Sequence, residues 1–432
     1  MPCAQADAKD EHGRLRAYLD RGQALSLARG GNAGTPLRGS DQWRDNDLTP
    51  CTRSSFGDSP AWCCDCASSG GTRGQGRRPN QDAFAVAHGV CRPDLLLVTV
   101  LDGHGPHGHF ISRHVRDRLP AWVAASAADG SVQAGVPAWV HRAGSTFLLD
   151  DTTGALTKCG STHGGRSGGG DKAQAPAWAA ALSRAYIALD EDLCACRSTL
   201  LAASKVTPDT SGCCVVTALV GAGHLVVASC GDSSAFLAIA PPAGAAPPEG
   251  ATRPPYGVRP FSLPHKPSGE EAKRIKQAGG RIGTMPREEH ILRVWPRPPD
   301  SSKGKGSSGS GTLGAPGSAD FGLAVSRAFG DLHWKSAGVC ATPDVAFKPL
   351  TPSDAFLVLC TDGVTDVMSA EEVVAVAADA LHGGRNAGEA VLEAAKHAWA
   401  TKWPKHARDD VTVAVVALQP SLWAGEGDGK ET

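Results

Sequence analysis

Apolar residues along the chain gather in six short runs bounded by turn residues, a pattern typical of buried β-strands. The runs cover residues 95–101, 213–220, 224–230, 234–240, 355–361 and 411–418. Several follow one another directly, without helices between them, notably from 213 to 240. This order favours an α+β protein in which helices cover antiparallel sheets, and it disfavours a doubly wound parallel sheet.

Four further segments carry the spacing of amphipathic helices. They cover residues 109–127, 176–195, 268–280 and 369–384. The last two begin with the pattern Ser-x-x-Glu, at Ser268/Glu271 and Ser369/Glu372, and both end on glycines. In this pattern the two side chains bind the free backbone N–H groups of the first helical turn. We therefore predict a capping box at the start of both helices.

Parts of the chain lack this periodicity. Residues 1–70 and 420–432 are predicted to be flexible tails, because they show no sustained apolar pattern. Low-complexity segments near 158–172 and 298–318 interrupt the periodic region. Since no internal repeat is evident, we predict one domain over residues 71–419, with two inserted loops.

The composition argues against two classes of partner. The chain has 43 Lys plus Arg and 44 Asp plus Glu, a net charge of −1, which provides no positive field for nucleic acid or anionic lipid. No stretch reaches the roughly 18 to 20 apolar residues of a membrane span, and the first residues lack the apolar core of a secretory signal. We expect a soluble monomer in the cytoplasm, the nucleus or both, without nucleic-acid or membrane partners.

The chain has 14 cysteines, and some of them, including Cys213, Cys214 and Cys360, lie inside apolar runs. A reduced cysteine packs there as a small hydrophobic residue, which suits a reducing compartment. Four others lie near the start of the chain: Cys51, Cys63, Cys64 and Cys66. They could supply four thiolates to zinc, but their spacing is not that of paired C-x-x-C ligands. We favour poorly structured cysteines over a zinc site.

Aspartates follow three of the predicted strands. They are Asp102, Asp232 and Asp362, each beside a glycine, and an acidic pair, Asp409 and Asp410, precedes the last strand. Each one alone is explained by a turn, where Asp-Gly is common. In antiparallel sheets, however, strand ends lie beside strand beginnings, so all of these carboxylates can meet at one edge. Such an all-oxygen cluster favours a hard divalent cation such as Mg²⁺ or Mn²⁺.

Three histidines follow the first of these aspartates: His104, His107 and His109. Their Gly- and Pro-rich spacing matches no tight metal-binding loop. We therefore interpret them as surface or helix-start histidines rather than as imidazole ligands.

Eight segments, taken in order, resemble the metal-dependent serine/threonine protein phosphatases of type 2C, and especially their plant-type branch. They are RRPNQDAF, LDGHGPHGHF, SGCC, SCGDSSAFL, HKPSGEEAKRIKQAGGRI, LAVSRAFGD, TDGVTDVMSAEEVV and ARDDVTVAVVAL. The resemblance spans about residues 72 to 418. It implies a central β-sandwich of two antiparallel sheets with helices on both outer faces and a two-metal site at one edge.

The resemblance also implies which residues hold the ions, two Mg²⁺ or Mn²⁺. The direct ligands would be Asp102, the carbonyl of Gly103, Asp362 and Asp409, with Asp82 beside them. Asp232, and less surely Asp366, match the position that binds a third, weaker ion in some members. A water molecule bridging the two ions would then hydrolyse phosphoserine and phosphothreonine in phosphoprotein substrates.

Two further residues would act on the substrate. Arg77, with Arg78 as the alternative, matches the family's arginine that holds the phosphate through paired guanidinium donors. The reaction also needs a protonated group or a metal-bound water to assist the leaving oxygen, and His104 is our candidate for that acid. Gln81 stands where many members have glutamate, so the charge near the ions differs here.

Two other functions stay open. A pseudophosphatase would keep the fold as a protein-binding module, although every metal aspartate is present. A metal-dependent phosphodiesterase or nuclease could use similar carboxylates, but it would need a basic track for a polyanion.

Overall fold

A computed structural model describes residues 63–72, 79–90, 92, 94–128, 145–150, 155–158, 174–221, 223–249, 253–286, 288–296, 322–419 and 422. The segment at 298–318, residues 159–172 of the other predicted insertion, most of both predicted tails, and Cys51, Arg77 and Arg78 lie outside these ranges.

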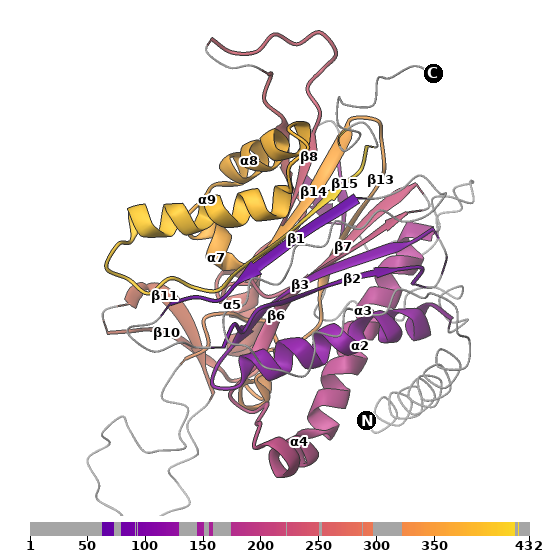
Figure 1. Ribbon diagram of the computed structural model, residues 1–432. Coiled ribbons are helices and arrows are strands. Elements are labelled where there is room, and N and C mark those ends of the chain that lie inside the picture. Colours follow the sequence, from indigo (N-terminus) through magenta and orange to yellow (C-terminus); the bar gives the residue numbers. More distant parts are fainter. Residues whose placement is uncertain are drawn as a thin grey trace, which may run out of the picture.

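Two sheets form the centre of the molecule (Figure 1). The smaller sheet has five antiparallel strands, in the order β1 (Cys63–Ser69), β15 (Val411–Ala417), β14 (Asp354–Cys360), β8 (Ser234–Ile239) and β9 (Gly257–Pro260). The larger sheet has the order β2 (Ala83–His88), β3 (Leu96–His104), β6 (Gly212–Gly221), β7 (His224–Cys230), β13 (Asp344–Pro349), β4 (Thr146–Leu149) and β5 (Leu156–Lys158). A short strand, β12 (Phe329–Gly330), pairs with β6. All of these pairs are antiparallel except β13 with β4, which is parallel.

Helices cover both outer faces. The larger sheet is covered by α2 (Gly108–Ala128) and α3 (Gln174–Ala195), and the smaller one by α8 (Ala370–His382) and α9 (Ala387–Lys402) (Figure 1). The remaining elements are α4 (Arg197–Ser204), α5 (Gly269–Gln277), the hairpin of β10 (Arg281–Met285) and β11 (Glu288–Trp295), α6 (Leu332–Lys335) and α7 (Asp362–Thr365). The predicted α+β sandwich with helices outside is confirmed.

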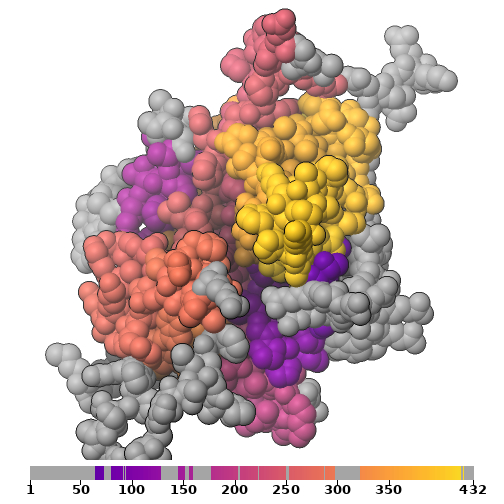
Figure 2. Space-filling view, turned by 90° about the vertical axis from the view of Figure 1, so that its left-hand side faces the viewer, coloured from indigo at the N-terminus to yellow at the C-terminus, as the bar shows by residue number. Residues whose placement is uncertain are grey.

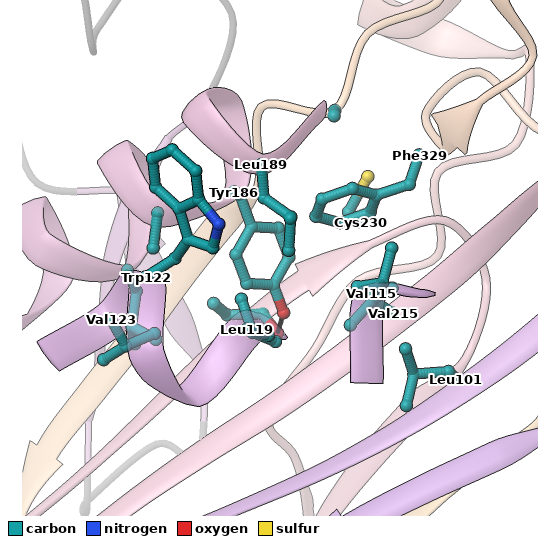
Figure 3. Close-up of a cluster of buried hydrophobic side chains, with 14 of the residues drawn as sticks. Leu101, Val115, Leu119, Trp122, Val123, Tyr186, Leu189, Val215, Cys230 and Phe329 are labelled. Carbon is teal, nitrogen blue, oxygen red and sulfur yellow. Dashed lines mark hydrogen bonds between the residues drawn. The ribbon is translucent and has the colours of Figure 1, made fainter. Parts of the chain in front are cut away.

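Three apolar clusters fill the spaces between the four layers, and β3 contributes to two of them. Its residues Leu96, Val98 and Val100 face the other sheet, whereas Leu97 and Leu101 face α2 and α3. Successive side chains of a strand point to opposite faces, so a strand buried on both sides needs an uninterrupted apolar run. Figure 3 shows the cluster under α2 and α3, where Tyr186 lies among Leu119, Trp122 and Phe329.

Residues 63–69 correct the predicted N-terminal tail. They form β1, the edge strand of the smaller sheet, paired with the Val-rich β15. Cys64 and Cys66 are buried between the sheets with their sulfurs 3.4 Å apart, so the expectation of poorly structured cysteines was wrong for this pair. Among the described residues no third Cys, His or acidic ligand joins them, and the other two cysteines weighed as zinc ligands, Cys51 and the side chain of Cys63, lie outside the described part of the chain.

The two predicted capping boxes have different outcomes. At α8, Ser369 accepts from the Glu372 N–H and Glu372 accepts from the Ser369 N–H, as predicted. At α5 the box is absent, because the Glu271 carboxylate binds the Arg327 guanidinium instead, at 2.7 Å. A charged, nearly buried arginine is a stronger partner for a carboxylate than a backbone N–H.

None of the helices in the described ranges is long and apolar enough to cross a membrane.

Candidate metal centre

The candidate site lies at one end of the sandwich, between the two sheets. Asp102 lies on the same face of β3 as Leu96, Val98 and Val100, which pack in the apolar core between the sheets. Its carboxylate therefore lies at the edge of that core. The strand runs three residues further than predicted, to His104. The start of α2 and α7 lie at this end, toward the left of Figure 1.

Three predicted metal ligands meet here. The ligand oxygens of Asp102, Asp232 and Asp362 all lie within 4.8 Å of one another. They come from β3, from the turn after β7 and from the first residue of α7. The α7 turn is held in place by α9, where Trp399 Nε1 donates to the Gly363 carbonyl at 2.7 Å. The expectation that carboxylates at strand ends converge is confirmed for these three.

The cluster is electrostatically unfavourable without a cation. Burial, and then the charge of Asp362, raises the pKa of Asp102 well above its ordinary value. Burial, and then the charges of Asp232 and Asp409, does the same to the pKa of Asp362. Carboxyl groups in this state either keep a proton or bind a cation that replaces it.

Asp82 has a buried carboxylate oxygen without a partner among the described residues. Its side chain is buried, and Oδ2 accepts a hydrogen bond from Thr361 Oγ1 at 3.0 Å. Oδ1 is also buried, yet it has no hydrogen-bond partner within the described part of the chain. Burial, and then Asp410, raises the pKa of Asp82 well above its ordinary value. A buried carboxylate oxygen without a donor is costly unless an ion binds it, so the residues present fit a hard divalent cation.

The two acidic residues before β15, Asp409 and Asp410, have different surroundings. Asp410 accepts hydrogen bonds from the backbone N–H groups of Gly71 and Gln81, so it ties two loops to the start of β15. Within the part of the chain that the structure describes, Asp409 makes no such bond to another segment. Its charge contributes, after burial, to the raised pKa values of Asp82, Asp102 and Asp362. Asp409 is thus the member of the pair that is available to a cation.

Gly103 lies where three backbone segments approach closely. A Cβ atom built on it would lie 2.2 Å from the Gln81 carbonyl oxygen and 2.7 Å from that of Gly108. Only glycine fits this position. Gln81 is fixed beside it, because its Nε2 donates to the Gly105 carbonyl at 2.8 Å.

His104 is bound to a carboxylate that we did not predict. Its Nε2 lies 2.6 Å from Oδ2 of Asp331, whose side chain is buried. Burial lowers the pKa of His104, but the charge and hydrogen bond of Asp331, together with the charges of Asp232 and Asp362, raise the pKa above its ordinary value. His107 and His109 flank the start of α2, where both rings lie near Phe110, in agreement with our interpretation of them as helix-start residues.

Lys266 is the second residue that we missed. Its ammonium group forms an ion pair with Asp232. Burial raises the pKa of Asp232, but the charge and hydrogen bond of Lys266, with smaller contributions from Cys214 and His104, together lower it. Asp366 lies close enough for Lys266 and Asp232 to affect its pKa. Burial has the largest effect and raises the pKa of Asp366. Lys266 stands in the segment HKPSGEEAK, and nothing in its spacing indicated a partner 34 residues earlier.

Comparisons with known proteins agree with the family resemblance of the sequence. Residues 173–403 match the family model described as Protein phosphatase 2C. The chain is 31% identical over 345 residues to Probable protein phosphatase 2C 12 of Oryza sativa subsp. japonica, covering 79% of this chain and 78% of that protein. It is also 31% identical over 354 residues to Probable protein phosphatase 2C 38 of the same plant, covering 78% of this chain and 66% of that protein.

The fold is similar to a solved structure as well. The crystal structure of serine-threonine phosphatase 2C from Toxoplasma gondii superposes with a TM-score of 0.60 at 21% identity, covering 86% of this chain and 98% of that one. At this level of identity the likeness concerns the architecture of the two sheets and their helices.

Proposed function

The chain belongs to the protein phosphatase 2C family, and from this premise we propose that it hydrolyses phosphoserine and phosphothreonine in proteins, with two Mg²⁺ or Mn²⁺ ions. One observation carries the proposal most. Three carboxylates with oxygens within 4.8 Å of one another lie beside Asp82, whose buried Oδ1 has no donor among the described residues. Such an arrangement is stable when cations are bound to it.

We assign the ions to Asp82, Asp102, Asp362 and Asp409 together with the Gly103 carbonyl, and a third, weaker ion to Asp232 with Asp366. Bound ions of this kind lower the pKa of water to make a nucleophile and absorb charge on the phosphoryl oxygens. Lys266 already neutralises part of the Asp232 charge, which is consistent with weaker binding of an ion there.

Arg77 and His104 act on the substrate in this proposal. Arg77 holds two phosphoryl oxygens through its paired N–H groups. A water oxygen forms the new bond to phosphorus while the ester P–O bond breaks. His104 gives a proton to the departing serine or threonine oxygen and later regains one from solvent.

The test uses the full chain with a phosphothreonine peptide. Excess chelator should abolish phosphate release, and Mn²⁺ or Mg²⁺, but not Zn²⁺, should restore it. Asp362→Asn should lower turnover by more than the roughly 10- to 100-fold typical of losing a residue that only supports a ligand. Asp379→Asn is the matched control, since Asp379 lies exposed on α8 and pairs with Arg385, beyond the end of that helix.

Four results would overturn the proposal. Full activity in chelator would exclude the metal centre, and normal turnover of the folded Asp362→Asn variant would exclude the ligand assignment. A folded protein that releases no phosphate with either ion would be a binding module instead, and one that cleaves DNA but not the phosphopeptide would be a nuclease.

A further inference from the structure

We propose that Asp331 is a positioning residue that fixes the ring of His104 for proton transfer to the leaving oxygen. The inference rests on the proposed function, and it adds a residue to which the family resemblance assigned no role. Its basis is the hydrogen bond between Asp331 Oδ2 and His104 Nε2 at 2.6 Å, formed by residues 227 positions apart.

The register of three strands brings the two residues together. His104 at the end of β3 lies opposite Gly212 at the start of β6. Gly212 in turn lies opposite Gly330 of β12, and Asp331 is the next residue along the chain. The carboxylate therefore has to pass over Gly212 to reach the imidazole.

Gly212 leaves the space for that path. A Cβ atom on Gly212 would lie 2.3 Å from Asp331 Oδ2, so any other residue at this position would displace the carboxylate. The absence of a side chain here is what lets the two strands share one hydrogen bond between side chains.

The backbone of Asp331 is held from two sides. Its N–H donates to the Ser211 carbonyl at 2.9 Å, and the N–H of Gly330 donates to Asp190 Oδ1 at 2.8 Å. Asp331 adopts the left-handed conformation, with φ of 49°, which few residues other than glycine, asparagine and aspartate accept. A strained residue that is held this firmly often serves a functional geometry.

The bond has a direct consequence for the ring. A carboxylate accepts a hydrogen from Nε2, so the nitrogen left to face a substrate is Nδ1. Within the described ranges, Nδ1 has no hydrogen-bond partner, and His104 is the sole partner of the Asp331 carboxylate. The His104 side chain is 27% exposed, whereas that of Asp331 is 1% exposed, so the imidazole alone can reach a ligand. During the reaction the proton leaves Nδ1 for the serine or threonine oxygen, and Nε2 keeps its hydrogen.

The experiment compares two substrates that differ in their need for an acid. A phosphoserine peptide has a poor leaving group and needs a proton donor, whereas 4-nitrophenyl phosphate has a good one and does not. Asp331→Asn should lower kcat on the peptide by about 10- to 100-fold, part of the usual contribution of a general acid. The decrease in kcat that Asp331→Asn causes on the aryl phosphate should be at least about tenfold smaller than its decrease on the peptide. His104→Gln should show the same difference between the two substrates. The double variant should be no worse than His104→Gln, because the two residues act as one unit.

Asp190→Asn is the matched control. Asp190 is a partly buried carboxylate that holds the same loop, through Gly330 and Lys335, but it does not contact His104. Its variant should lower thermal stability and affect both substrates alike. If Asp331→Asn also lowers both substrates equally, its role is structural and the inference is wrong.

A measurement without turnover separates this inference from the proposed function. In protein labelled with ¹⁵N-histidine, with the His104 signals assigned by their loss in His104→Gln, the neutral ring should carry its hydrogen on Nε2. Asp331→Asn should give a mixture of the two tautomers, since an amide can donate or accept. If the wild type releases no phosphate but shows this change, the proposed function fails and the positioning role stands. A ring with its hydrogen on Nδ1 in the wild type would overturn the positioning role.

Discussion

Replacing Asp362 by asparagine should make the metal-free protein more stable while it abolishes metal binding. An oxygen of Asp362 lies within 4.8 Å of oxygens of Asp102 and Asp232. Burial, and then the charge of Asp232, raises the pKa of Asp362, so the charged carboxylate is less favourable in the folded chain than in the unfolded one. Asparagine has nearly the same size and no charge, so this repulsion disappears.

The distance sets the magnitude of the effect. Two unit charges at the 4.8 Å limit repel each other by about 0.9 kcal/mol at the dielectric constant of water, and by about 3.5 kcal/mol at an effective value of about 20. Among the neighbouring charges, that of Asp232 affects Asp362 most, and Lys266 offsets part of it. Proton uptake by the wild-type cluster removes a further part. We expect the free energy of unfolding to rise by about 1 to 3 kcal/mol.

The assay is urea unfolding in excess chelator, with Asp379→Asn as the control for loss of an exposed carboxylate. In Mn²⁺ the order should reverse, because binding to the folded state stabilises the wild type alone. If Asp362→Asn is less stable than the wild type in chelator, its carboxylate supports the fold itself, and the electrostatic argument is refuted.

The pH dependence of this difference has a definite sign. A carboxyl group with a raised folded-state pKa binds more protons when folded, so the stability it contributes is lost as pH rises from its ordinary value of 3.8 through the raised pKa. The advantage of Asp362→Asn should be small near about pH 3.5 and should grow as pH rises. An advantage that is constant across this range would contradict the assignment.

Two more variants test the neighbourhood of the ions. Gln81→Glu should lower the Mn²⁺ concentration for half-maximal activity several-fold, since it adds a charge worth on the order of 1 kcal/mol. Gln81→Glu should also lower the stability of the metal-free protein by about 1 kcal/mol, because a carboxylate cannot donate to the Gly105 carbonyl. If the Mn²⁺ concentration for half-maximal activity is unchanged or higher, Gln81 does not lie near the ions. Arg77→Ala should lower kcat/KM for the phosphopeptide at unchanged Mn²⁺ half-saturation, as measured by steady-state kinetics, with Arg78→Ala as its control. If Arg78→Ala lowers kcat/KM and Arg77→Ala does not, the phosphate-binding residue is Arg78.

The sequence by itself determined those features whose cause is local or repeats along the chain. β3, β6, β7, β8, β14 and β15 were predictable because a strand buried on both faces must be apolar throughout, whatever its neighbours are. The capping box at Ser369 was predictable because both partners lie within one turn. The convergence of Asp102, Asp232 and Asp362 was predictable because antiparallel strands bring their ends to a common edge.

Tertiary structure alone decided the partners that lie far apart in the chain. The sequence of β1 has little of the apolar pattern of a strand, and the segment is a strand because its backbone pairs with β15. Glu271 lost its helix-capping role to Arg327, 56 residues away, and His104 gained Asp331 across the start of β6. In each case a stronger partner lies close in space without any fixed spacing in sequence. The energy of a hydrogen bond or ion pair depends on the distance between atoms, which only the packed sheets and loops set.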